Sequence, residues 1–279
     1  IGTGKAATGH GGRITITVGS GDKNNGGAIS IVAGTTTQAA ATGKGGQIDI
    51  TAGSGKGATG GAISMIAGSG AKSTSGAVTI KSVAAGTKGI SGALVFSSGT
   101  TTSGNSGSIS VGTGTSALGH GGNIAVTVGA GTKNNGGDVT VIAGESTDAG
   151  AHTGGRVIVT AGLGRGTKGA GTMALSGGEG TLHTGGAVTV LSGSGVASSS
   201  GAIKIKTVNA GTKGISGALM FSSGTTSSGD SGLLSIGSGT STSGHGGLIS
   251  ITVGSGTKNA GGAISIVAGT TTQAAATGK

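Results

Sequence analysis

Residues 27–34 read Gly-Ala-Ile-Ser-Ile-Val-Ala-Gly, a short alternation of apolar and small residues that begins and ends at glycine. Ile29 and Ile31 stand two positions apart, with Ser30 between them. In an extended chain, side chains two apart lie on the same face, so this alternation predicts a short strand with both isoleucines on one face. The glycine-rich residues that follow predict a turn.

The same pattern returns along the whole chain. Each repeat begins at a glycine, here called the anchor, with Ile, Val, Leu or Met at the second position after it and one of these or Phe at the fourth. The sixth position is small or Val, and Gly follows it in 15 of the 17 repeats, which average 15.6 residues. The anchors are Gly12, Gly27, Gly46, Gly61, Gly76, Gly92, Gly107, Gly122, Gly137, Gly155, Gly171, Gly186, Gly201, Gly217, Gly232, Gly247 and Gly262.

The composition excludes several classes of protein. Of 279 residues, 70 are Gly, 9% are charged, two are Phe, and none is Pro, Cys, Trp or Tyr. Collagen needs Gly at every third position together with abundant Pro, and disulfide scaffolds need Cys. A mean hydropathy of +0.22 is too high for a flexible or disordered linker, and no apolar run approaches the roughly 20 residues of a membrane helix.

The repeats predict an all-β fold, a parallel β-solenoid of about 15–16 residues per coil and roughly 17 coils, forming one elongated rod over residues 1–279. A helical solenoid is disfavoured because Gly costs about 1 kcal/mol relative to Ala in a helix. Stacked coils would bury the second and fourth positions. This expected core stack contains Ile14, Ile16, Ile29, Ile31, Ile48, Ile50, Ile63, Met65, Leu94, Phe96, Val139, Val141, Leu219, Phe221, Ile264 and Ile266.

The short repeats are grouped into a longer sequence repeat. Gly-His-Gly-Gly occurs at residues 9–12, 119–122 and 244–247, and the long repeats run near 12–121 and 122–246, with a third begun at 247. Residues 236–279 match residues 1–44 at 35 of 44 positions. We therefore expect the chain to be a segment of a longer repetitive protein.

The ionisable residues do not form a catalytic or metal-binding pattern. Seven acids are spread over 17 repeats, and Glu145 and Asp148 are the one pair close in sequence. His10, His120 and His245 are seven or eight repeats apart, too far to share a metal. Residues 164–169 match a dinucleotide-binding pattern in letters, but no helix follows. We expect no enzyme activity and no cofactor.

Two features of the surface suggest partners. Six lysines occupy one turn of the repeat and form a sparse basic ribbon, which serves solubility or attracts an acidic polysaccharide or mineral surface: Lys23, Lys88, Lys133, Lys168, Lys213 and Lys258. Nucleic acid is disfavoured because no aromatic residues accompany the lysines. Apolar residues on the outer face predict lateral packing of copies, at Val32, Ile66, Ile142, Ile158, Leu191 and Val267.

Ice binding is a further alternative for a repetitive Thr-rich chain. A flat ice-binding face would repeat Thr at the third and fifth positions, but the first repeat alone has both, at Thr15 and Thr17. Lys204, Lys206 and Asp49 would interrupt such a face. The pattern therefore favours a structural role over ice binding.

Residues 26–43, 103–122 and 185–195 resemble the Gly/Ser/Thr-rich repeats of very long exported proteins, including algal surface proteins and microbial adhesin stalks. The resemblance covers the whole chain and implies an extracellular or cell-surface structural protein. Together with the repeats, it predicts a non-enzymatic rod or filament subunit of an appendage, wall or adhesive. The alternatives are a stalk that binds polyanions or polysaccharides and an ice-binding protein.

Overall fold

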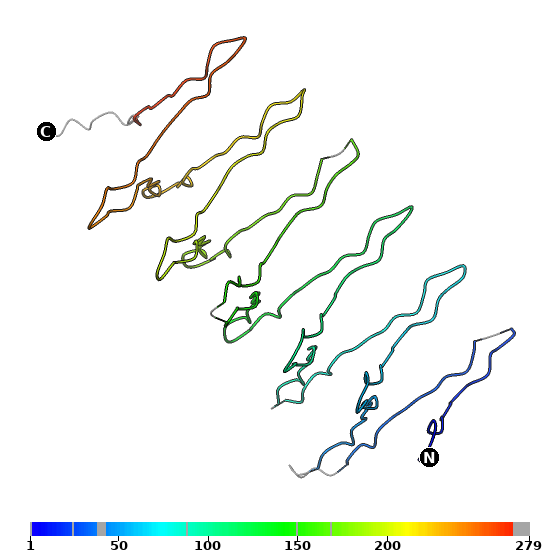
Figure 1. Ribbon diagram of the computed structural model, residues 1–279. Helices are drawn as coiled ribbons and strands as arrows, with labels where there is room; N and C mark the ends of the chain where they lie inside the picture. Colours follow the sequence, from blue (N-terminus) through cyan, green and yellow to red (C-terminus); the bar gives the residue numbers. More distant parts are fainter. Residues whose placement is uncertain are drawn as a thin grey trace. The chain divides into compact units, whose positions relative to one another are not determined.

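The computed structural model describes residues 2–23, 25–37, 43–87, 89–148, 150–167 and 169–269. These residues contain no helix and no strand; extended segments alternate with short bends and turns, as Figure 1 shows. The chain divides into two units, Ile1–Asp138 and Val139–Lys279. The same sequence of extended segment and loop runs through each unit.

The predicted parallel β-solenoid is wrong. In the described residues no sheet connects one repeat to another, and the backbone hydrogen bonds join residues no more than twelve positions apart. A parallel ladder needs bonds between residues at least one whole coil apart. The physical reason is that a ladder would use the amides of the anchors and the carbonyls before them. In several repeats these two groups bond to each other across a single loop instead.

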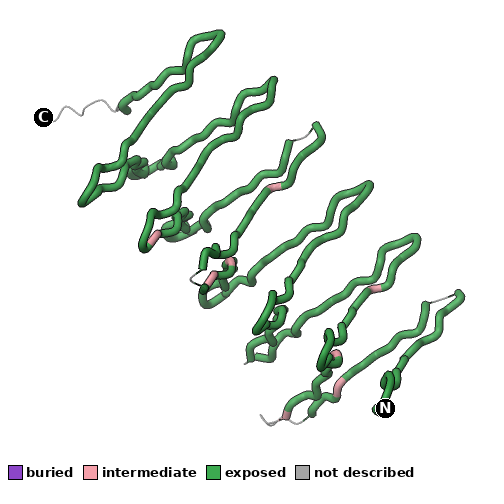
Figure 2. The backbone as a smooth tube through the Cα atoms, viewed as in Figure 1, coloured by how far each residue is buried: buried purple, intermediate pink, exposed green. Residues whose placement is uncertain are grey.

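The predicted burial of the second and fourth positions is also wrong. No described residue is buried, and Figure 2 shows the tube coloured as exposed almost throughout. The expected core residues that are exposed are Ile14, Ile16, Ile29, Ile31, Ile48, Ile50, Ile63, Met65, Leu94, Phe96, Val139, Val141, Leu219, Phe221, Ile264 and Ile266. Without a neighbouring coil, nothing covers them. The outer residues Val32, Ile66, Ile142, Ile158, Leu191 and Val267 are exposed as well.

The solvent-accessible surface area of the chain is much larger than that of a folded domain of the same mass. It is 27749 Å². A folded chain of 25.1 kDa would expose about 10,000 Å², and the same chain fully unfolded about 36,000 Å². The observed conformation therefore leaves roughly 17,000 Å² more surface in water than a folded domain of this mass.

Side chains alternate between the two faces of an extended segment, although the repeats do not stack on one another. Ile29 is 54% exposed and Ile31 70%, whereas Val32 on the other face is 82% exposed. Side chains two positions apart also meet: Gln47 Nε2 donates a hydrogen bond to Asp49 Oδ2 at 2.7 Å. Most repeats with a large apolar residue on the outer face thus have a more covered and a more open face, as expected of an extended chain with period 2. In two repeats the fourth-position residue is the more exposed: Val159 at 71% against Ile158 at 67%, and Ile266 at 88% against Val267 at 85%.

Candidate interaction surface

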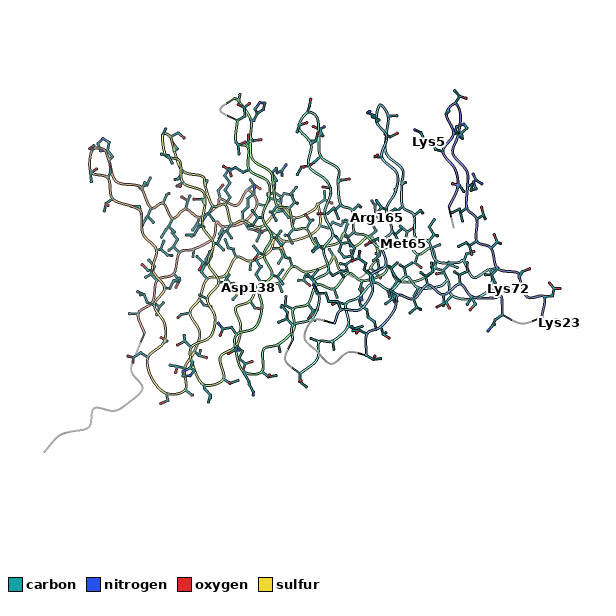
Figure 3. All side chains as sticks on the ribbon, turned by 90° about the horizontal axis from the view of Figure 1, so that it is seen from below. Lys5, Lys23, Met65, Lys72, Asp138 and Arg165 are labelled. Atoms are coloured by element: carbon teal, nitrogen blue, oxygen red, sulfur yellow. The ribbon has the colours of Figure 1, made fainter. Side chains whose placement is uncertain are left out.

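The candidate site is the apolar row of each repeat, formed by the side chains at the second and fourth positions after the anchor. The second-position side chains are the more covered of the two in most repeats, as in Ile63 at 53% and Met65 at 65%. Figure 3 shows the labelled side chain of Met65 on an extended segment of the first unit. No pocket is present among the described residues, so these rows are the apolar surface available to a partner.

A hydrogen bond between two glycines closes many of the loops and forms what we call the neck. The anchor amide donates to the carbonyl of the glycine at the seventh position of the preceding repeat. The neck bonds are Gly27 to Gly19 at 3.3 Å, Gly46 to Gly34 at 2.8 Å, Gly61 to Gly53 at 2.8 Å, Gly76 to Gly68 at 2.9 Å, Gly155 to Gly144 at 2.8 Å, Gly171 to Gly162 at 2.9 Å, Gly186 to Gly178 at 2.8 Å and Gly201 to Gly193 at 2.9 Å.

The sixth-position residue lies against the next anchor, and the neck is shorter at Ala52 than at Val18. A Cβ atom on Gly61 would stand 3.4 Å from the Cβ of Ala52, and the neck there is short. At Gly27 the neighbour is the larger Val18, whose Cγ1 occupies the place of a Cβ, and the neck lengthens to 3.3 Å. A side chain on Gly27 would therefore collide with the preceding repeat, whereas a Cβ on Gly61 would make an ordinary van der Waals contact.

The alanines at the sixth position are the best covered side chains of the repeats. Ala33, Ala52, Ala67, Ala143 and Ala161 are half-buried, whereas the isoleucines and valines beside them are exposed. Each of these alanines precedes a closed neck. Side-chain contact within these repeats is thus concentrated at the sixth-position alanine. The large apolar side chains remain free for contact with other molecules.

One class of loop has glycine at the ninth position, with two backbone atoms packed against it. At Gly55, the carbonyl oxygens of Ala58 and Thr59 would both lie 2.5 Å from an added Cβ. We call these carbonyl-packed loops. They occur at Gly55, Gly70, Gly131, Gly164, Gly180, Gly195 and Gly256, where two carbonyl oxygens, or at Gly164 one oxygen and one amide nitrogen, make the close approach.

A second class of loop has Ser or Thr at the ninth position. Thr101 Oγ1 accepts a hydrogen bond from the amide of Ser103 at 3.3 Å, and Thr226 does the same with Ser228. Gly104 and Gly229 follow with φ of 108° and 110°. Equivalent residues of the long repeat, 125 positions apart, therefore have the same local structure.

The basic residues are exposed and unpaired. In the described part of the chain no lysine or arginine forms an ion pair. Of the predicted basic ribbon, Lys23, Lys133, Lys213 and Lys258 are exposed, whereas Lys88 and Lys168 lie outside the described residues. Figure 3 places Lys23 and Lys72 at loop ends of the first unit.

The acids and histidines form no catalytic arrangement among the described residues. His152 Nε2 lies 3.4 Å from Asp148 Oδ2, and both side chains are mostly exposed. An exposed pair of this kind contributes about 0–1 kcal/mol to stability. Glu145 joins no ion pair with them, and no group of three or more possible metal ligands is found in this part of the chain.

Comparison with protein-family models, curated proteins and solved structures finds no match to this chain. Among the described residues, no helix is long and apolar enough to cross a membrane.

The sequence pattern did not reveal why particular positions are glycine. The anchor and the ninth position both looked like turn residues, whereas the structure gives each one a specific neighbour. A signal was present in the sequence: a small sixth-position residue precedes an anchor that is always Gly. Pairing the anchors with the alanines at the sixth position would have predicted five of the eight necks.

Proposed function

We propose that this chain is a non-enzymatic structural protein whose copies associate through their apolar rows, as a subunit of an extracellular fibre, wall or adhesive. The observation that carries this proposal is the exposure of the apolar row in every repeat. Exposed, contiguous apolar surface on this scale is typical of interaction surfaces.

Another copy of the same chain is the partner that fits best. A standard protein–protein interface buries about 1,200–2,000 Å² in total, far less than the roughly 17,000 Å² of excess surface. A partner that covers every row must therefore be as long and as repetitive as this chain. A second copy presents the same rows at the same average spacing of 15.6 residues.

The backbone supports the same proposal. Residues 28–33 make no backbone hydrogen bond, so their amides and carbonyls are available to pair with another extended chain. An extracellular location is supported by the resemblance of the repeats to exported proteins. The dispersed acids and the lack of a catalytic arrangement in the described residues support a structural role over an enzymatic one.

Sedimentation velocity of the 279-residue chain tests self-association. The test variant carries Ile31→Asn, Ile50→Asn, Ile205→Asn and Ile251→Asn, all at the fourth position. The matched control carries Ser30→Asn, Thr51→Asn, Thr79→Asn and Ser265→Asn, which lie on the other face. We expect the native chain and the control to assemble at micromolar concentration, and the test variant to need a concentration more than about tenfold higher, because each Ile loses part of a transfer free energy of about 1.5–3 kcal/mol. A native chain that stays monomeric, or equal behaviour of the two variants, would contradict the proposal.

A further inference from the structure

We propose that the carbonyl-packed loops that carry a basic residue form a repeated binding site for an extended acidic polysaccharide. The loops concerned are those of Gly55 with Lys56, Gly70 with Lys72, Gly131 with Lys133, Gly164 with Arg165, and Gly256 with Lys258. This site uses the loops rather than the apolar rows, so it does not rest on self-association.

Basic residues and loop class go together in the sequence. Eight repeats have Gly at the ninth position, and six of these have Lys or Arg one or two residues later. Nine repeats have another residue at the ninth position, and none of them has a basic residue one or two residues later. Two of these nine, with Ala85 and Ala210 at the ninth position, have a lysine three residues later, at Lys88 and Lys213. Basic residues that contributed to net charge alone would be expected at this position in both classes of loop.

The loop structure explains how such a residue is presented. Two backbone groups approach the ninth-position glycine so closely that a side chain would not fit, so the observed path of the next few residues requires glycine at this position. The basic residue lies directly after this close approach, and Lys56, Lys72 and Lys133 are exposed.

The charges are free to bind an external anion. Fourteen of the chain's 17 basic residues are described, and none of them is paired with a carboxylate. A single exposed cation binds an anion weakly, but several on one chain bind one polymer with a large gain in effective concentration. The fitting ligand is therefore a polymer with many negative charges rather than a small anion.

A polysaccharide fits these loops better than a nucleic acid does. Proteins that bind single strands stack bases on aromatic side chains. The two aromatic residues here, Phe96 and Phe221, belong to the apolar rows and not to the loops. The loops instead contain Gly, Ser, Thr and Asn, whose backbone and side chains offer hydrogen bonds to hydroxyl groups.

Retention of the full chain on polygalacturonate-coupled beads tests the site, with uncharged dextran beads as the background. The loop variant carries Lys56→Gln, Lys72→Gln, Lys133→Gln, Arg165→Gln and Lys258→Gln. The matched control carries Lys5→Gln, Arg13→Gln, Lys81→Gln, Lys204→Gln and Lys206→Gln. Each set removes five charges, so both variants have a formal net charge of +5 in place of +10.

We expect the native chain and the control to be retained, and the loop variant to elute at clearly lower salt. The slope of log affinity against log salt should fall by roughly one for each lysine or arginine that no longer binds the polymer. Equal weakening in the two variants would show that net charge alone is responsible and would overturn the proposal. Displacement by a mixed-sequence single-stranded oligonucleotide more readily than by free polygalacturonate would assign the loops to nucleic acid instead. Sedimentation of both variants separates this result from self-association, which two variants of equal net charge should alter to the same extent.

Discussion

The amide of Gly61 donates a hydrogen bond to the carbonyl of Gly53 at 2.8 Å, and this bond closes the loop between two successive apolar rows. Ala52, one residue before Gly53, lies against Gly61 and is half-buried. At this neck, two small residues meet across the loop. No neck bond forms after Val128, Val253 or Ser98, whereas a long one of 3.3 Å forms after Val18.

Enlarging the sixth-position residue should open a neck. We expect Ala52→Val to lengthen or break the bond between Gly61 and Gly53, because the added methyl groups push the anchor away. Loss of a bond worth about 1 kcal/mol should raise the exchange rate of the Gly61 amide roughly fivefold, measured by NMR hydrogen exchange. Ala62→Val makes the same change one residue after the anchor and should leave that amide unaffected. An unchanged Gly61 amide in Ala52→Val would contradict the role of Ala52.

A side chain at a ninth-position glycine should rearrange a carbonyl-packed loop. A Cβ on Gly131 would collide with the carbonyl oxygens of Asn134 and Asn135. We therefore expect Gly131→Ala to open this loop and to speed cleavage by trypsin after Lys133, followed by mass spectrometry of the fragments. Gly129→Ala is the control, since nothing lies within 4 Å of that position. Equal cleavage rates in both variants would show that the close approach does not constrain the loop.

The positive φ of Gly104 should make this position intolerant of a side chain. At φ of 108°, an alanine costs about 1–3 kcal/mol in backbone strain. We expect Gly104→Ala to disturb the preceding turn and to raise the exchange rate of the Ser103 amide, which bonds to Thr101 Oγ1. Gly99→Ala, at a glycine without positive φ and with no neighbour within 4 Å, should have no such effect. A slow Ser103 amide in Gly104→Ala would disagree with this account.

Salt should favour self-association of the native chain. Copies with a formal net charge of +10 repel each other, and salt screens that repulsion over a Debye length of about 30 Å at 0.01 M and 8 Å at 0.15 M. Contact between apolar rows is not weakened by this screening. The sedimentation coefficient at fixed protein concentration should therefore rise between these two salt concentrations. A decrease would mean that ionic contacts, not apolar rows, hold the copies together.

Features that depend on neighbouring residues were predictable from the sequence. The alternation at Ile29 and Ile31 predicted two faces, and the exposures of these residues and Val32 differ accordingly. The exposed lysines Lys23 and Lys133 were also predictable, because charged residues in turns remain in water. Side-chain direction and turn position follow from the local backbone alone.

The relation between repeats was decided by the tertiary structure. Alternation says which side chains share a face, but it does not say what covers that face, since this depends on residues fifteen or more positions away. The sequence pattern predicted that one repeat would stack on the next. The structure instead joins Gly53 to Gly61 across a single loop, and the apolar rows remain open. The packing of Ala52 on Gly61 and of two carbonyl oxygens on Gly55 arises from the path of the loop, which residue type alone does not determine.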